Sequence, residues 1–400
     1  MYLERLTLLN FRNYRQLEMG PPRGPSVLYG DNAQGKTNFL EAVYLLSIAK
    51  SFRADNERQV VNREGAQSEG QALVAGLFRT RNEALDIRVG LQCLWPLDAN
   101  RASAEEDDAP QYQVRKRIQV NGTPSTATQM MGLAPAVLFT ATDIDLVSGP
   151  PAERRRFLDI LISQVNRRYL RSLQRYQRVL YQRNQLLKLL REGRASREEL
   201  AFWNEELVKE GAFIMRCRRE ALSAIAVLAR ERLRSLTSGD EFLEVRYAPS
   251  APLDEASDGE SALAGALEAE GERERALGIT IVGPHRDDVR LLIDGTDTAT
   301  YASRGQARTI GLALRLAEAA YLTDLKGEEP ILLLDDVLSE LDPSRRQQVM
   351  EAALAHEQAL ITTADLAILE GSLLADASIF RVHKGTVEPS SVSLRRRRSP

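Results

Sequence analysis

Cysteine and histidine are scarce in this 400-residue chain, which contains two Cys and three His. The two cysteines, Cys93 and Cys217, are too few for a disulfide framework and lack the spacing of metal ligands. Three scattered histidines also exclude most zinc sites. Long apolar runs are missing as well, since none approaches the roughly eighteen residues that a membrane-spanning helix requires. We therefore expect no structural metal cage and no membrane partner.

The N-terminus lacks the apolar core of a signal peptide, because Glu4 and Arg5 interrupt its first ten residues. Hydrophobic residues make up 43% of the chain and charged residues 27%, which is typical of a globular protein in water. We expect a cytoplasmic protein, and 400 residues predict two or three domains.

The hydrophobic period changes along the chain. Alternation over residues 1–30 and 71–94 predicts strands, and the acidic stretch 98–110 is typical of a hairpin tip. From residue 151 the apolar side chains follow one helical spacing as far as 190. A second helical run, 200 to about 236, can fold back on the first as an arm of roughly 60 Å. Strands return from residue 278, which completes an α/β pattern with an antiparallel N-terminal β subdomain. We predict a domain made of residues 1–149 and 277–400, with a helical arm inserted at 150–276.

Residues 30–37, GDNAQGKT, match the pattern G-x-x-x-x-G-K-[ST] in full, between an apolar strand and a helical run. In such a loop the backbone N–H groups turn inward around phosphate, and the following helix adds a favourable dipole. The Lys36 ammonium is expected to reach the β- and γ-phosphates of a nucleotide, and the Thr37 hydroxyl to ligate Mg²⁺. The predicted phosphate-binding residues are Gly30, Asp31, Asn32, Ala33, Gln34, Gly35, Lys36 and Thr37.

Two further motifs complete the predicted nucleotide site. Four aliphatic residues, 331–334, precede Asp335 and Asp336, as in a buried strand that delivers carboxylates to the edge of a sheet. Asp335 would hold Mg²⁺, and Asp336 would orient or deprotonate the attacking water, so we assign both as catalytic. Ser303 opens a helical run with a second phosphate-facing N-terminus. An ordinary serine cap explains the same pattern, and both interpretations stay open.

Arginine-rich residues 151–197 predict a DNA-binding face, because basic side chains there far outnumber acidic ones. Contacts from such a face to phosphates would be independent of sequence and sensitive to salt. A solvated face in an arginine-rich chain is an equally good explanation. The candidate contacts are Arg154, Arg167, Arg168, Arg171 and Arg175.

The order of these motifs resembles the head of an ABC-type ATPase. The P-loop is followed by Ser303-Arg-Gly-Gln306, by the carboxylate-ended strand and by Ser339-Glu-Leu-Asp342. Four stretches are similar to the RecF family of bacterial recombinational repair proteins, and the similarity extends over the whole chain. They are residues 10–14 (NFRNY), 30–41 (GDNAQGKTNFLE), 148–159 (SGPPAERRRFLD) and 282–288 (VGPHRDD).

The resemblance implies a P-loop ABC-type head with a short helical arm, ATP and Mg²⁺ as cofactors, and a homodimer that forms on ATP. It also implies binding to DNA at single-strand gaps or junctions, cooperation with RecO and RecR to load recombinase, and roles in replication restart and SOS induction. Arg12 and Asn13 would lie near the base. Ser303, Gly305 and Gln306 would form the signature, and Asp342 would belong to the D-loop.

Two departures from the ABC pattern bear on activity. Asp336 stands where transporters have glutamate, and residues 361–365 (ITTAD) replace the transporters' switch histidine. We therefore expect slow ATP hydrolysis, and the resemblance implies a DNA-stimulated ATPase that acts as a switch. A structural tether of the SMC kind would need an arm hundreds of residues long, and a soluble ABC subunit of a transporter would need the switch histidine. The structural tether and the transporter subunit remain the less favoured alternatives.

Overall fold

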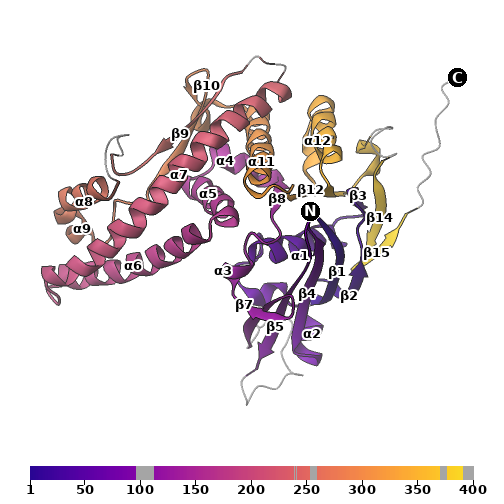
Figure 1. The fold of residues 1–400 in the computed structure, drawn as a ribbon, viewed down its shortest axis with the longest axis horizontal. Helices are drawn as coiled ribbons and strands as arrows, with labels where there is room; N and C mark the ends of the chain where they lie inside the picture. Colours follow the sequence, from indigo (N-terminus) through magenta and orange to yellow (C-terminus); the bar gives the residue numbers. More distant parts are fainter. Residues whose placement is uncertain (96–111, 238, 240, 253–258, 370–375, 391–400) are drawn as a thin grey trace. The chain divides into compact units, whose positions relative to one another are not determined.

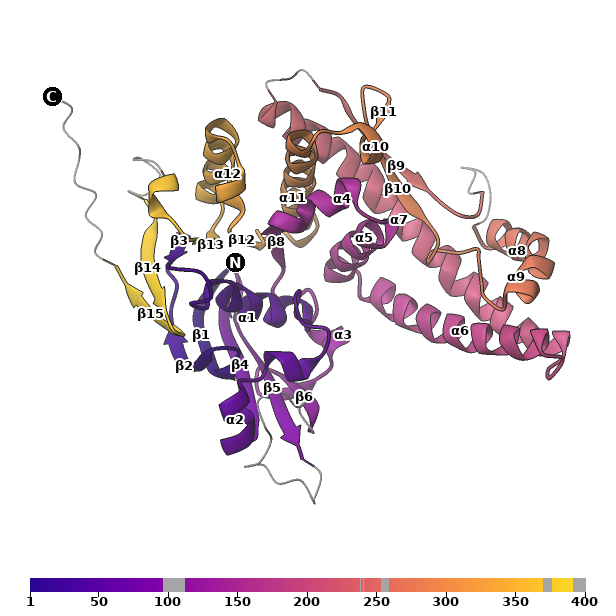
Figure 2. The ribbon, with the colours of Figure 1, turned by 180° about the vertical axis from the view of Figure 1, so that it is seen from behind.

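The computed structural model describes residues 1–95, 112–237, 239, 241–252, 259–369 and 376–390. The predicted hairpin tip at 98–110 lies outside these residues. Contacts divide the chain into two compact units, Met1–Ala141 with Leu322–Pro400, and Thr142–Tyr321. The expected arm, residues 150–276, lies within the second unit, which also includes 142–149 and 277–321. Figures 1 and 2 show the ribbon from opposite sides.

The first unit contains an antiparallel sheet with the strand order β2-β1-β4-β5-β6-β7. Every second residue of β4 and β5 is buried, as the alternating sequence predicts. Short helices join these strands. The elements are β1 (Tyr2–Phe11), β2 (Tyr14–Met19), η1 (Glu57–Val60), α2 (Arg63–Ser68), β4 (Gln71–Arg79), β5 (Ala84–Leu94), β6 (Gln113–Val120), β7 (Thr123–Ser125) and α3 (Ala127–Met130).

A second sheet of the same unit has the order β15-β14-β3-β13-β12-β8, in which only the β14–β15 pair is antiparallel. Because β3, β13 and β12 are parallel, their carboxyl ends meet at one edge. Helices α1 and α12 lie on opposite faces of this sheet (Figures 1 and 2), and α1 also contacts the antiparallel sheet. The elements are β3 (Gly24–Tyr29), α1 (Lys36–Ile48), β8 (Ala136–Thr140), β12 (Ile331–Asp335), η4 (Val337–Glu340), α12 (Pro343–Ala355), β13 (Gln358–Thr363), η5 (Leu366–Ile368), β14 (Ser378–His383) and β15 (Thr386–Pro389).

The second unit is mainly helical, with a small antiparallel sheet in the order β11-β10-β9. Helices α6 and α7 pack against each other as the predicted hairpin. The elements are η2 (Ala141–Ile144), α4 (Asp145–Ser148), α5 (Pro151–Val165), α6 (Arg167–Arg191), η3 (Arg197–Glu199), α7 (Leu200–Leu236), β9 (Leu243–Ala248), α8 (Gly259–Ala269), α9 (Gly271–Leu277), β10 (Asp288–Ile293), β11 (Thr296–Asp297), α10 (Thr298–Tyr301) and α11 (Arg304–Lys326), whose last residues belong to the first unit.

One helical expectation was wrong. The single period from 151 to 190 is broken at Asn166, whose extended backbone ends α5 and begins α6. The Asn166 side chain accepts a hydrogen bond from the Tyr169 N–H at 3.0 Å, as a helix N-cap does. The apolar spacing continues across this break, so the periodicity alone did not reveal it.

Candidate functional site

The loop between β3 and α1 has a backbone that only glycine accommodates at two positions. Gly30 and Gly35 have φ values of 154° and 117°. A Cβ on Gly30 would lie 2.3 Å from the Val382 carbonyl oxygen, and one on Gly35 would lie 2.7 Å from the Asn13 side chain. Gly35 also stands at the N-cap of α1, so the first N–H groups of that helix open onto the loop. This is the geometry of a phosphate-binding loop.

Lys36 spans this loop from the first turn of α1. Its Nζ donates to the carbonyl oxygens of Gly30 at 2.6 Å and of Asp31 at 2.8 Å. Burial lowers the pKa of Lys36, while the carboxylates of Asp336, Asp335 and Asp31 oppose that shift. The ammonium therefore sits at the centre of the loop, where a phosphate oxygen could take over a backbone bond.

Asp335, the last residue of β12, lies beside Thr37. The Thr37 hydroxyl donates to its Oδ1 at 2.8 Å, and the Thr362 hydroxyl donates to the same oxygen at 2.9 Å. Burial raises the pKa of Asp335, although these hydrogen bonds and the charge of Arg53 oppose the rise. A hydroxyl and a carboxylate at this distance fit Mg²⁺, which usually takes one or two protein oxygens and completes its shell with phosphate and water.

Asp336 has two unusual features. Its backbone is left-handed, with φ 52° and ψ 22°, which costs energy for a residue other than glycine. Its N–H donates to the Thr362 hydroxyl at 3.0 Å, but its buried Oδ1 has no hydrogen-bond partner among the described residues. An acceptor held in this way is suited to bind a water molecule or a ligand proton.

These groups open onto a cavity of about 650 Å³ in the first unit. The predicted base-side residues Arg12 and Asn13 line it together with the loop. Arg12 also bonds Glu41, with Nη2–Oε1 at 2.6 Å and Nε–Oε2 at 2.8 Å. Among the lining residues that were not predicted, five follow α1 in a stretch without a motif. These are Arg53, Gln59, Val61, Asn62 and Arg63.

The β14–β15 turn supports the loop, a contact that the sequence did not predict. The N–H of Lys384 donates to Gln34 Oε1 at 2.8 Å, and the N–H of Gly385 donates to the Gln34 carbonyl at 3.0 Å. Asn13 Nδ2 donates to the same carbonyl at 2.8 Å. Gln34 therefore links the loop to two neighbouring turns, and no local pattern joins residue 34 to residues 384–385.

The predicted signature residues begin α11 in the second unit. Ser303 Oγ accepts from the Gln306 N–H at 3.2 Å, and Gln306 Oε1 accepts from the Ser303 N–H at 3.0 Å, which forms a capping box. Gln306 Nε2 also donates to Glu241 at 2.8 Å, and the Gly305 carbonyl accepts from Thr309. Ser303 is exposed. The structure therefore contains the ordinary serine cap, one of the two interpretations that the sequence left open.

Asp342, the predicted D-loop residue, caps α12. Its Oδ1 accepts from the Arg345 N–H at 3.0 Å, and its Oδ2 pairs with the Arg345 guanidinium at 2.9 Å. The Arg345 N–H also lowers the pKa of Asp342.

Of the five candidate DNA-contacting arginines, Arg154 must be removed. Its Nε and Nη2 donate to the Asp288 carboxylate at 2.7 and 3.0 Å, and its Nη1 donates to the Gly149 carbonyl at 2.9 Å. The buried guanidinium is therefore engaged inside the second unit. By contrast Arg167, Arg168 and Arg171 are exposed on α6, as is the remaining candidate, Arg175, which pairs with glutamates of α7.

The stretch at 282–288, which had no predicted role, belongs to a buried polar cluster of the second unit. Arg218 of α7 is 2% exposed and donates to Asp159 Oδ1 at 2.8 Å and to the Pro284 carbonyl at 2.6 Å. His285 Nδ1 lies 2.7 Å from the Tyr176 hydroxyl, and burial lowers the pKa of His285 to about 4. These contacts assign the stretch a structural role.

Several known proteins resemble this chain in sequence and in fold. Residues 2–387 match the family described as RecF/RecN/SMC N terminal domain. Proteins named DNA replication and repair protein RecF are 38% identical in Herpetosiphon aurantiacus, over 98% of this chain and all of that one, and 39% identical in Symbiobacterium thermophilum, over 97% and 98%. A solved structure titled recombination mediator protein RecF-ATP in the RecFOR pathway has a TM-score of 0.83 at 31% identity and covers 98% of each chain. The Smc head domain of Pyrococcus furiosus shares the fold, with a TM-score of 0.52 at 15% identity over 97% of this chain and 96% of that one.

The fold and the loop, strand and helix motifs define a P-loop ABC-type ATPase head of the kind found in SMC proteins, a mixed α/β architecture with a helical hairpin. No described helix is long and apolar enough to cross a membrane. With relatives at this identity over its full length, the chain belongs to the RecF family.

Proposed function

We propose that the protein binds ATP and Mg²⁺ at residues 30–37 and acts as an ATP-dependent DNA-binding protein of recombinational repair. The observation that carries this proposal is the approach of the Thr37 hydroxyl to the Asp335 carboxylate, at 2.8 Å, beside a loop that Lys36 spans. Relatives named for DNA replication and repair, and a relative solved with ATP, support it.

Different residues of the site would bind the phosphates and the Mg²⁺ ion. The N–H groups of the loop and the Lys36 ammonium would bind phosphate oxygens, while Thr37 and Asp335 would hold Mg²⁺. That ion neutralises charge on the β- and γ-phosphates when bound. Among the described residues no group of three His, Cys, Asp or Glu side chains could hold a metal ion. Phosphate oxygens of the nucleotide and water would therefore complete the shell of the Mg²⁺, as is usual for this ion.

Asp336 would then orient the attacking water through the buried Oδ1 that has no partner among the described residues. Because aspartate is one methylene shorter than the glutamate of transporters, we propose that ATP hydrolysis is slow. DNA would stimulate this hydrolysis, which would return the protein from its ATP-bound state. Arg12 and Asn13 would contact the base and ribose from the cavity wall.

The helix start at Ser303, with Gly305 and Gln306, would complete the ATP site of a second copy, with the D-loop at Asp342 contributing to the same interface. The exposure of Ser303 at the N-terminus of a 23-residue helix supports this arrangement. Two copies that exchange the same contact form a closed dimer with two-fold symmetry.

Ultracentrifugation with ATP and Mg²⁺ tests the dimer. Ser303→Arg places a long cation at the helix end, so this variant should bind ATP as a monomer. Asp336→Asn should keep the closed site but lose the acceptor for water, so ATP-bound dimers should accumulate. If Ser303→Arg dimerises like the parent protein, the shared site is refuted.

Duplex regions beside single-strand gaps or junctions would bind through Arg167, Arg168, Arg171 and Arg175 of α6, with RecO and RecR as partners in loading recombinase during repair, replication restart and SOS induction. The relatives' assignment to a RecFOR pathway supports these partners. We propose residues 1–149 and 277–400 as the ATPase head and 150–276 as the arm. At 37 residues, α7 spans only about 56 Å, which disfavours a long structural tether.

A gel-shift assay at two salt concentrations, with and without ATP, tests DNA binding. We expect a gapped duplex to shift only with ATP, and less so at high salt. Binding that ignores ATP in both salts would contradict the proposed switch.

A further inference from the structure

The second unit exposes an aromatic ring just before the helix start at Ser303. Tyr301 is the last residue of α10, and its side chain is 74% exposed, the largest fraction among the large apolar side chains that the structure describes. An exposed ring leaves apolar surface in water, so a partner that covers this surface is bound favourably. Tyr301 therefore offers a contact to another molecule.

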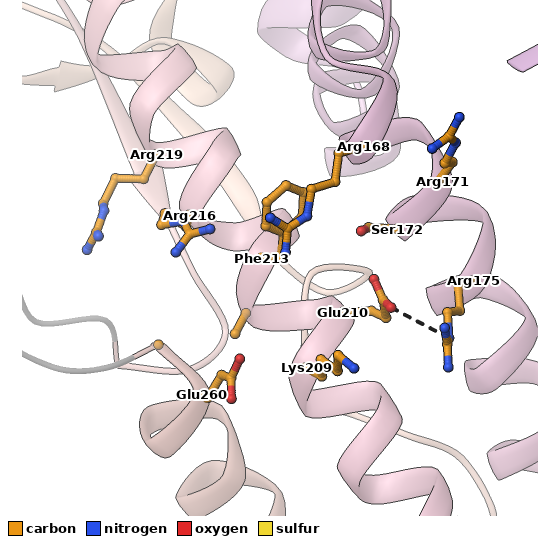
Figure 3. A pocket seen from close by; sticks show the side chains of 12 residues that line it. Arg168, Arg171, Ser172, Arg175, Lys209, Glu210, Phe213, Arg216, Arg219 and Glu260 are labelled. Atoms are coloured by element: carbon orange, nitrogen blue, oxygen red, sulfur yellow. Dashed lines mark ion pairs between the residues drawn. The ribbon is translucent and has the colours of Figure 1, made fainter. Parts of the chain in front are cut away.

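Two other rings at the surface of this unit are already covered by arginines. The guanidinium carbon of Arg168 lies 4.2 Å from the centroid of the Phe213 ring, beside the pocket between α6 and α7 (Figure 3). The guanidinium carbon of Arg230 lies 4.2 Å from the centroid of the Phe242 ring. Tyr301, by contrast, has no hydrogen bond and no ring contact with the described residues. A partner for its ring has to come from another molecule.

The backbone that carries Tyr301 is fixed by hydrogen bonds. The Asp297 side chain accepts from the Ala299 N–H at 2.9 Å and so caps α10. The hydroxyl of Thr298, which is buried, donates to the Leu291 carbonyl at 3.0 Å. A ring on an anchored turn gives up little conformational freedom when it binds, so more of the contact energy contributes to affinity.

Tyr301 stands close to the helix end that is expected to meet a nucleotide. The one intervening residue, Ala302, has an extended backbone with φ −67° and ψ 134°. Two residues of extended chain span at most about 7 Å, which limits the distance between the Cα atoms of Tyr301 and Ser303. In the proposed dimer, Ser303 faces the γ-phosphate of a nucleotide in the second copy. The Tyr301 ring would then lie within reach of the sugar and base of the same nucleotide.

The cavity of the first unit supplies polar groups for that base but no ring. Arg12, Asn13 and Arg53 are among the residues that line it, and none of the described lining residues is aromatic. A base has two flat faces, and both aromatic rings and guanidinium groups stack on such faces. Guanidinium groups of the cavity can cover one face, and the other is available to a ring from a second copy.

We propose that Tyr301 of one copy stacks on the base of the ATP that is bound in the second copy. The inference rests on the proposed shared site, and it adds a residue that contacts the base rather than the phosphates. Each copy would contribute one ring, so a dimer with two-fold symmetry would contain two such contacts. Dimerisation would thereby favour the whole nucleotide over its triphosphate, which would leave both rings exposed.

Two variants of the full-length protein test this contact by ultracentrifugation with ATP and Mg²⁺. Tyr301→Ala removes the ring, and we expect it to dimerise at least about tenfold more weakly than the parent protein. Tyr301→Phe keeps the ring and should dimerise like the parent. Tyr181→Ala, which removes an exposed tyrosine of α6, is the matched control and should leave dimerisation unchanged.

A fluorescent nucleotide separates a contact with the base from a contact with protein. The triphosphate of 2-aminopurine riboside replaces ATP, because stacking on an aromatic ring quenches its fluorescence. At protein concentrations that form dimers, the parent and Tyr301→Phe should quench the probe, and Tyr301→Ala should not. In a Ser303→Arg background, which should stay monomeric, Tyr301→Ala should leave ATP affinity unchanged, because the ring serves the site of the other copy.

Each other result overturns the inference or the proposal on which it rests. Tyr301→Ala dimers as stable as those of the parent would remove the contact, and weaker dimers that still quench the probe would show that the ring packs on protein. A Tyr301→Phe protein that fails like Tyr301→Ala would assign the contact to the hydroxyl group. A loss of ATP affinity in the Ser303→Arg background would place the ring at the ATP of its own chain. A parent protein that stays monomeric with ATP would instead refute the proposed shared site.

Discussion

Each of the two compact units buries a cluster of charged side chains, and the clusters differ in what their polar atoms contact. In the first unit, Lys36 bonds two backbone carbonyls and Asp336 keeps a buried Oδ1 without a partner among the described residues. In the second unit, Arg218 donates to Asp159, Tyr169 and the Pro284 carbonyl. No atom of that cluster is among the described buried polar atoms that lack a partner.

The difference separates a site from a scaffold. A buried polar group without a partner costs free energy, so its persistence beside a cavity indicates a ligand that satisfies it. A closed cluster gains nothing from a ligand and instead fixes the packing of the helices around it. We therefore expect substitutions in the first cluster to abolish nucleotide binding, and substitutions in the second cluster to lower the free energy of unfolding.

The largest expected effect is on stability, in Arg218→Ala. Removing this guanidinium leaves the Asp159 and Asp287 carboxylates without their shared cation, and breaking a buried pair costs about 3–5 kcal/mol. Urea unfolding should show this loss, while ATP affinity of the remaining folded protein stays unchanged. Arg232→Ala, at an exposed position of the same helix, is the control. A loss below about 1 kcal/mol would show that the cluster is not a scaffold.

Lys36→Ala should have the opposite profile. Nucleotide affinity should fall at least about a hundredfold, or roughly 3 kcal/mol, because the bound phosphates would no longer face the Lys36 ammonium. The melting temperature should change little, since only two loop carbonyls are left without this donor. Calorimetric titration with ATP measures the first quantity, and Lys50→Ala, at an exposed position just after α1, is the control. ATP binding within about threefold of the parent would refute the P-loop assignment.

The cluster of the first unit could be predicted from the sequence more fully than the cluster of the second unit. Lys36 and Thr37 are neighbours in a single motif that comes shortly after a strand. Asp335 ends another strand, whose apolar pattern marks it as buried. Parallel strands then bring their ends together. Arg154 was assigned wrongly because its burial depends on Asp288, which lies 134 residues along the chain. The bonds from residues 384–385 to Gln34 are equally remote, and no local pattern announces them.

A smaller effect is expected from pH in the second cluster. Burial lowers the pKa of His285 from 6.5 to about 4, although the hydrogen bond to the Thr280 carbonyl opposes this shift. The charges of nearby arginines, of which Arg286 has the largest effect, lower the pKa further. As pH falls below 6.5, the unfolded chain takes up this proton before the folded chain does. Stability is therefore lost with a slope that stays below 1.4 kcal/mol per pH unit, and the loss is about 1.6 kcal/mol between pH 6.5 and 5.

His285→Gln should remove that slope, because glutamine can keep hydrogen bonds with Tyr176 and Thr280 but does not titrate. Urea unfolding of both proteins at pH 7, 6 and 5 gives the difference. Identical slopes for the two would mean that His285 is protonated as readily in the folded protein as in the unfolded one.

The smallest effect on the folded state is expected outside both clusters, on the exposed face of α6. Replacing Arg167, Arg168 and Arg171 with Ala should change the melting temperature little, because these side chains are exposed and Arg168 and Arg171 pair with no described carboxylate. Duplex DNA binding should weaken, and its dependence on log salt should flatten by up to about 0.9 for each DNA phosphate that the variant no longer neutralises. Filter binding over a range of salt concentrations measures the slope, with Arg232→Ala as the control. A slope that stays at the parent value would make this face a solvated one, and the protein would then have to bind DNA through another surface.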